Sequence, residues 1–331
     1  MKHSLKITGI ILLMFLLTQL IGLFVVNHYS TIKIIQGNLT NVSAPELPFG
    51  METPEIEKPQ EFNQIFLSII IAFIIAISLL FFLMRFKAEF FLKLWFFIVI
   101  IIALGISFNS IIPNKIAYSS LIALIIALPL AFIKIYKRSF LIHNLTELFI
   151  YPGIAAVFVP ILNFYTVIIL LLLISVYDMW AVWHSGIMQK MAKYQINKLK
   201  VFSGFFIPYL NEKTKAIIKK IKNPKELEKK KVKVNIAILG GGDVIFPIIA
   251  AGVMLKTFGF VKIAGHNLPL ASLLVILGAI FGLSYLFFFS EKKKFYPAMP
   301  FITSGIFLGI ALSWIIYSKI LGLAINFGFL F

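Results

Sequence analysis

Two aspartates are the residues of this chain whose type and placement best suit chemistry. Asp178 lies in the segment LLLISVYDMWAV and Asp243 in ILGGGDVIFP, and no other aspartate occurs among the 331 residues. Both segments are apolar enough to lie inside a membrane. An ionisable side chain at membrane depth costs at least about 2.5 kcal/mol on insertion scales, so we expect both residues to have a function.

Two carboxyl groups that meet in a low-dielectric site cannot both ionise easily and tend to share one proton. The ionised group can take a proton from a water that attacks a peptide carbonyl, while the protonated group donates to the developing oxyanion. This chemistry requires no metal and no cofactor, and we expect neither. The alternative for two intramembrane aspartates is a proton or cation relay in a channel or transporter. Position alone gives the two hypotheses similar weight.

The elements that must position the aspartates are membrane-spanning helices. The chain is 60% apolar and only 13% charged, whereas soluble domains are nearer half apolar and a quarter charged. This composition excludes a secreted or cytosolic enzyme and indicates an all-α, multi-pass membrane protein. The first apolar stretch lacks a small-residue cleavage site, so we expect a retained anchor. Nine stretches are long enough to cross a core of about 30 Å: residues 5–27, 64–84, 91–109, 117–136, 144–162, 163–184, 234–256, 267–290 and 297–318.

The aspartates fall on the sixth and seventh of these stretches. Counting 1.5 Å per residue places Asp178 roughly 9 Å and Asp243 roughly 13 Å from the same membrane face. We therefore expect the two side chains to meet.

Three short motifs lie toward that face. Glycines before an aspartate remove side-chain bulk and let another backbone approach, although they also suit close helix packing. Proline is common at the start of a helix. The motifs are Tyr177-Asp178 on the sixth stretch, Gly240-Gly241-Gly242-Asp243 on the seventh, and Pro297-Ala298-Met299 at the start of the ninth.

In this order and on these stretches, the motifs resemble those of the presenilin and signal peptide peptidase family of intramembrane aspartyl proteases. That family carries a YD, a GxGD and a PAL motif on its sixth, seventh and ninth helices. The resemblance covers roughly residues 163–331, and the first five stretches match in number only. Met299 stands where the family has leucine, which nearly conserves volume.

The resemblance implies a presenilin-like fold of nine transmembrane helices with Asp178 and Asp243 as the catalytic dyad. It further implies that the substrates are transmembrane helices of other proteins and that a prokaryotic homologue requires no accessory subunit. Residues implied to shape the active site and bind substrate are Tyr177, Gly240, Gly241, Gly242, Pro297, Ala298 and Met299.

The relay hypothesis makes a different demand on the sequence. A relay across the membrane requires acidic groups at several depths, and we expect none in the other stretches, so the protease is favoured.

We divide the chain into an N-terminal five-helix bundle, residues 1–162 with an external loop at about 28–63, and a catalytic part. The catalytic part is residues 163–331, with a cytoplasmic loop at about 185–233.

The basic residues predict the orientation. The formal net charge of +18 would suggest nucleic acid in a soluble protein, but here Lys and Arg divide unequally between the two membrane faces. The face that holds the N-terminus has 25 of them and the other face has 6. Without the long loop the counts are 11 and 6. By the positive-inside rule the N-terminus is cytoplasmic and the C-terminus external, the orientation of presenilins.

The loop at 185–233 is rich in lysine, and we expect a solvated linker whose lysines lie near anionic lipid headgroups. Its apolar segment 201–209 is expected to lie in the membrane interface. The segment Lys231–Ile236 alternates polar and apolar residues. It is either the frayed start of the seventh helix or an exposed strand edge that holds an unwound substrate by main-chain pairing.

Overall fold

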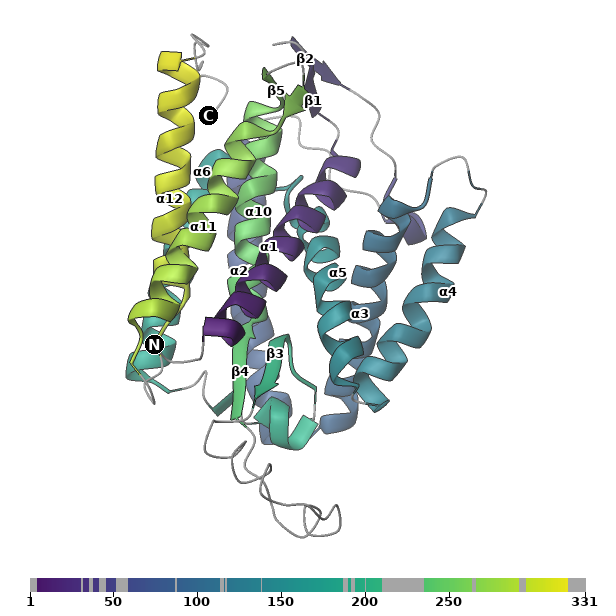
Figure 1. The fold of residues 1–331 in the computed structure, drawn as a ribbon. Coiled ribbons are helices and arrows are strands. Elements are labelled where there is room, and N and C mark those ends of the chain that lie inside the picture. The colour runs from purple at the N-terminus through teal and green to yellow at the C-terminus, as the bar shows by residue number, and fades with distance from the viewer. Residues whose placement is uncertain are drawn as a thin grey trace, which may run out of the picture.

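The computed structural model describes residues 5–30, 32–35, 38–41, 46–51, 59–86, 88–113, 116, 118–137, 139–186, 190–191, 194–199, 201–209, 235–263, 266–291 and 296–320. In these residues nine helices are long and apolar enough to cross a membrane, as predicted. They run side by side through the molecule (Figure 1). Their bounds are α1 Leu5–His28, α2 Pro59–Arg85, α3 Glu89–Ile111, α4 Ser119–Phe132, α5 Phe140–Phe158, α6 Phe164–Met179, α10 Gly241–Phe258, α11 Leu270–Phe289 and α12 Met299–Ile315.

Several short turns supplement these helices. The π-helical turns Ile133–Lys137, Trp180–His184 and Ile316–Ile320 continue α4, α6 and α12. A further π-helical turn spans Gln195–Leu199 and a 3-10 turn spans Pro48–Gly50. A helix satisfies its backbone within its own segment, which the hydrocarbon core requires. The long apolar stretches therefore form helices, and the fold is that of a multi-pass integral membrane protein.

Helix α10 lies at the centre of the bundle. It packs against α1, α5, α6, α11 and α12. Of its most apolar 18 residues, 67% are buried inside the protein, against 6% for α2. The core around it includes Phe15 of α1, Tyr151 of α5 and Leu283 of α11. Helix α10 carries Asp243, so this residue is surrounded by helices from both ends of the chain.

The division of the chain into an N-terminal bundle and a catalytic part at residue 162 stays a prediction.

Helices α11 and α12 approach each other backbone to backbone. A Cβ atom added at Gly278 or Gly282 of α11 would meet backbone atoms of α12, and one added at Gly305 or Gly309 would meet backbone atoms of α11. Small residues at a four-residue spacing allow such contact between membrane helices. The contact holds the start of α12, where the Pro297 motif lies, against the core.

Three antiparallel strand pairs accompany the helices in the described part of the chain. Strands β1 (Ile32–Ile35) and β2 (Asn38–Asn41) form one, and β5 (Val261–Ile263) and β6 (His266–Leu268) form another. Strands β3 (Gly204–Tyr209) and β4 (Asn235–Gly240) form the third, at the opposite end of the bundle (Figure 1). The helical class is confirmed, and these hairpins add to it.

The β3–β4 hairpin corrects two predictions. The seventh stretch was expected to be helical from residue 234, but residues 235–240 are strand and α10 begins at Gly241. Segment 201–209, which was expected to lie in the membrane interface, contains β3, whose Phe205 and Ile207 are buried within the protein. This part of the loop at 185–233 therefore contributes to the core and is not a solvated linker. The backbone of β3 pairs with β4, and its apolar side chains pack on α1, α5 and α10.

Of the segment Lys231–Ile236, Asn235 and Ile236 are the first residues of β4, so these two are strand and not the frayed start of a helix. That this edge holds substrate stays a prediction. Residues 231–234 lie outside the described residues. The fifth helix also differs from its prediction, because it spans Phe140–Phe158 rather than 144–162. Asn144 and Glu147 therefore lie in its first turns, and Pro160 lies beyond its end.

Candidate active site

Asp178 lies near the end of α6 and is bonded to the start of α12. Its side chain is buried, and its Oδ2 accepts a hydrogen bond of 3.0 Å from the backbone N–H of Met299, the first residue of α12. The backbone of Ala298 also hydrogen-bonds this carboxyl. The first amides of a helix have no partner within it and carry its positive dipole end, so they suit a carboxyl group.

The Pro297 motif therefore contacts the predicted catalytic residue directly. Pro297 and Met299 are buried, which fixes the backbone that donates to Asp178. One turn before Asp178 on α6 and one turn after Met299 on α12, Ser175 Oγ donates a 2.8 Å hydrogen bond to Thr303 Oγ1. Both hydroxyl-bearing residues are buried. These two contacts hold α6 and α12 in a defined relative position.

Asp243 is the third residue of α10 and is buried against the same face. Its carboxyl is hydrogen-bonded by the backbone of Gly240 and lies within range of direct electrostatic interaction with Asp178. The structure thus places the two aspartates close enough to interact electrostatically.

The local structure of the glycine motif before Asp243 differs from the prediction. The glycine motif was placed inside an apolar helix, about nine residues deep, whereas it lies at the junction between β4 and α10. The reason is that residues 235–240 pair with β3 and leave only the residues from Gly241 onward to the helix.

The three glycines differ in their surroundings. A Cβ atom at Gly241 would lie 2.8 Å from both Tyr151 Oη and Ser203 Oγ, so this position is closely packed. A Cβ at Gly240 would lie 3.2 Å from Asp243 Oδ2, whereas one at Gly242 would make only an ordinary contact of 3.7 Å with Phe246. The absence of side chains at Gly240 and Gly241 thus lets Ser203, Tyr151 of α5 and the Asp243 carboxyl approach the junction.

Tyr177 points toward a different neighbour from Asp178. Its ring centroid lies 6.2 Å from that of Phe73 of α2, edge to face, and 6.4 Å from that of Trp180. Tyr177 is half-buried in this contact. It therefore joins α6 to α2, the most exposed of the transmembrane helices.

Gln19 of α1 is a neighbour of the dyad that the sequence analysis missed. Its side chain is fully buried, and its Nε2 donates a 3.0 Å hydrogen bond to the backbone oxygen of Val244, the residue after Asp243. A lone amide in an otherwise apolar stretch was the available indication. This contact joins α1 to the first turn of α10.

A second missed group is a buried charged cluster on α4 and α5. Lys134 Nζ lies 2.6 Å from Glu147 Oε1 and 3.2 Å from His143 Nδ1. All three residues are buried. The expectation that no other stretch carries an acidic residue is therefore wrong, and Glu147 was visible in the sequence. Its charge is accommodated because Lys134 pairs with it.

Comparison with known proteins decides the family. The family model described as signal-peptide peptidase, presenilin aspartyl protease matches residues 11–319. The chain belongs to this family. Membership makes it an aspartic endopeptidase that cleaves within the membrane. No match is found among curated proteins.

Two solved structures of a presenilin family intramembrane aspartate protease share the fold of this presenilin-family chain. The structure in space group C222 has a TM-score of 0.54 at 19% identity and covers 92% of this chain and 97% of its own. The structure in space group P2 has a TM-score of 0.55 at 18% identity and covers 92% and 96%. The predicted presenilin-like fold is therefore confirmed over nearly the whole chain.

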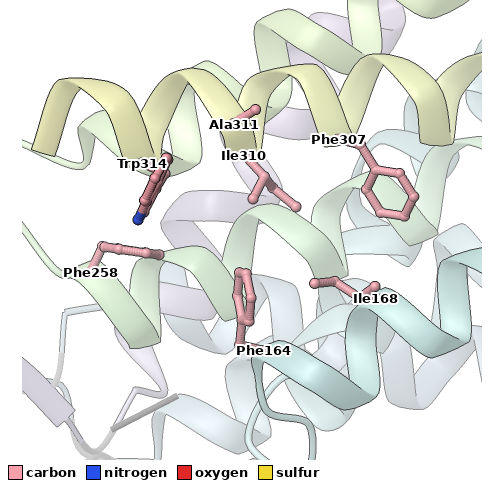
Figure 2. A pocket seen from close by; sticks show the side chains of 7 residues that line it. All are labelled: Phe164, Ile168, Phe258, Phe307, Ile310, Ala311 and Trp314. Atoms are coloured by element: carbon pink, nitrogen blue, oxygen red, sulfur yellow. The ribbon is translucent and has the colours of Figure 1, made fainter. Parts of the chain in front are cut away.

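Among the residues with described positions, no group of three or more His, Cys, Asp or Glu could hold a metal ion. A cavity of about 380 Å³ lies between α6, α10 and α12 (Figure 2). It includes Phe164, the first residue of α6, so it lies far along the helix from Asp178. It is almost entirely apolar and carries no catalytic group; its lining is Phe164, Ile168, Phe258, Phe307, Ile310, Ala311 and Trp314.

Proposed function

We propose that this protein hydrolyses peptide bonds within transmembrane helices of other membrane proteins, with Asp178 and Asp243 as its catalytic dyad. The observation that carries the proposal is that the only two aspartates of the chain are both buried, at adjacent ends of α6 and α10, within electrostatic range of each other. Because α6 ends and α10 begins at the same face as the N-terminus, we infer cleavage in the cytoplasmic half of the membrane.

The pair acts through one shared proton. The ionised carboxyl takes a proton from a water, and the oxygen of that water attacks the peptide carbonyl. The protonated carboxyl donates to the developing oxyanion, and the pair then protonates the leaving amine. The amide of Met299 holds one oxygen of the Asp178 carboxyl by its hydrogen bond. Protons and charge balance within the pair.

A transmembrane substrate must be unwound first, because a helix uses its peptide groups in its own hydrogen bonds. We infer that strand β4 supplies replacement partners. In an antiparallel ladder, successive residues direct their backbone groups to opposite edges. Gly204 and Phe206 of β3 bond to α5, so Phe205 and Ile207 face β4 and pair with Leu239 and Ala237.

By the same alternation, Ile236, Ile238 and Gly240 direct their backbone groups away from β3. In the described part of the chain, Ile236 and Ile238 have no backbone partner on that side. The third of these residues, Gly240, bonds to Asp243. A substrate strand added to this edge would therefore run toward the dyad.

The test is cleavage of a generic transmembrane peptide by the purified protein in detergent or lipid. We expect the parent to cleave the peptide and Asp178→Ala to leave it intact. The proposal is wrong if the folded parent cleaves no such peptide, or if Asp178→Ala cleaves at the parental rate.

A relay of protons or cations is the second candidate, because Glu147 adds an acidic group to the membrane region. Glu147 lies near the start of α5, at the same face as both aspartates, and it is paired with Lys134. The three acids therefore do not span several depths. Ion flux in protein-containing liposomes that disappears in Asp178→Asn, without any peptide cleavage by the parent, would favour the relay.

A further inference from the structure

The outer edge of β3 is bonded by side chains instead of by another strand. Asn144 Nδ2 of α5 donates a 2.9 Å hydrogen bond to the backbone oxygen of Phe206. The backbone N–H of Phe206 donates a 3.0 Å bond to Asn144 Oδ1. The amide of Asn144 thus takes the place of a neighbouring peptide group for both atoms.

Gly204 is bonded in the same way, two residues earlier on β3. His143 Nε2 lies 2.8 Å from the backbone oxygen of Gly204, and the N–H of Gly204 donates a 3.3 Å bond to Glu147 Oε1. Lys134 holds both side chains, since its Nζ lies 2.6 Å from Glu147 Oε1 and 3.2 Å from His143 Nδ1. Lys has donors only, so His143 accepts at Nδ1 and donates from Nε2 to Gly204.

These four residues, Lys134, His143, Asn144 and Glu147, are called the α5 bracket below. The next residue of β3 that faces outward is Pro208, which has no N–H. Every outward N–H of β3 from Gly204 to Pro208 is therefore either bonded to the bracket or missing. No donor remains on this edge for a substrate, whereas β4 offers Ile236 and Ile238.

The α5 bracket requires the burial of four polar or charged side chains. All four side chains are buried near the cytoplasmic ends of membrane helices, where charged and polar groups are unfavourable. A two-stranded hairpin by itself is only marginally stable. The bracket bonds β3 at two points, and β4 continues directly into α10 and Asp243. It therefore connects the α5 helix to the strand that precedes the dyad.

We propose that the α5 bracket is a positioning element that determines where a substrate is cut. By holding β3 in place, it leaves the outer edge of β4 as the edge for substrate and keeps that edge at one position relative to Asp243. Asn144 is the positioning residue with the most direct contact, because it bonds both backbone groups of Phe206. The inference rests on the proposed function, in particular on substrate pairing with β4.

The test is Asn144→Leu, which keeps a similar volume and removes both bonds to Phe206. If the hairpin is docked correctly only one tenth of the time, the apparent affinity for substrate falls about tenfold. We expect KM for a transmembrane peptide to rise roughly tenfold with kcat changed less than about threefold. We also expect mass spectrometry of the products to show cuts spread over neighbouring peptide bonds instead of the parental sites.

Two further variants control for folding. Leu145→Ala alters an exposed neighbour on α5 and is expected to keep the parental KM and cleavage sites. Asn144→Asp retains an acceptor for the N–H of Phe206 and loses the donor to its oxygen, so we expect an intermediate shift. Thermal unfolding is measured for each variant. If Asn144→Leu does not fold, Asn144→Asp carries the test.

Parental KM and parental cleavage sites in the folded variant would overturn the proposal, and so would a loss of kcat alone with unchanged sites. Failure of the underlying function is distinguishable. In that case the parent itself does not cleave, or Asp178→Ala remains active, whatever Asn144 does.

Discussion

At the scale of single residues, the proposed mechanism treats Asp178 and Asp243 as one unit. We expect Asp178→Asn and Asp243→Asn each to lower the cleavage rate by at least about 1,000-fold, and the double variant to be little worse, because residues that act together are not additive. Initial rates on a transmembrane peptide measure this. Multiplicative losses in the double variant would argue that the two aspartates work separately.

The same pair predicts the pH dependence of cleavage. At low pH both carboxyls are protonated and none can take the proton of water, so the rate falls. At high pH both are ionised and none can protonate the oxyanion or the amine, so the rate falls again. We expect a bell-shaped profile of kcat/KM whose two midpoints belong to the pair. A single sigmoid, with full activity retained at either extreme, would contradict a shared proton.

At the scale of elements, the outer edge of β4 is the part that the substrate hypothesis requires. Ile238→Pro removes an N–H that faces away from β3 and leaves the pairing with β3 intact, because proline is tolerated at an unpaired edge. We expect at least about tenfold lower kcat/KM for Ile238→Pro, measured with a transmembrane peptide.

The matched variant Ile238→Ala keeps the N–H and should retain most activity. Both variants must match the parent in expression and thermal stability. Normal cleavage by a folded Ile238→Pro variant would exclude strand pairing at this residue and leave the substrate to be held by some other backbone.

The contact between α11 and α12 is the second element whose role can be tested. Gly282→Leu would force side-chain atoms into the backbone of α12. Overpacking of this kind typically costs about 1–3 kcal/mol. We expect a clear fall in the temperature of thermal unfolding, together with lower activity, because α12 carries the amide that bonds Asp178.

Gly9 of α1 provides the control for this variant. An added Cβ at Gly9 meets nothing within 4 Å, so Gly9→Leu should unfold near the parental temperature. Equal stability of the two leucine variants would show that the close approach of α11 and α12 is not needed.

At the scale of the whole molecule, the distribution of charge predicts the orientation in the membrane. We propose that the N-terminus and the loop at 185–233 are cytoplasmic and that the C-terminus is external. The chain has no cysteine, so single cysteines can be introduced cleanly. We expect an impermeant thiol reagent on intact cells to label Asn267→Cys in the exposed strand β6 and to leave Lys215→Cys unlabelled. The reverse pattern would invert the topology.

The sequence by itself determined the nine helices of the described residues, the helices that carry the two aspartates, and the order of the three motifs. These features depend on local quantities, the length of an apolar stretch and the cost of an ionisable group inside it. The aspartates could therefore be found, and their meeting expected, because the sixth and seventh helices end and begin at one face.

Only the tertiary structure decided how the site is completed. The bond from Met299 to Asp178 joins residues 121 positions apart, and the bond from Asn144 to Phe206 joins residues 62 positions apart. Residues 235–240 became a strand because β3 was available to pair with them. Such contacts depend on which segments the folded chain brings together, since a polar group in an apolar stretch shows that it needs a partner without showing which one.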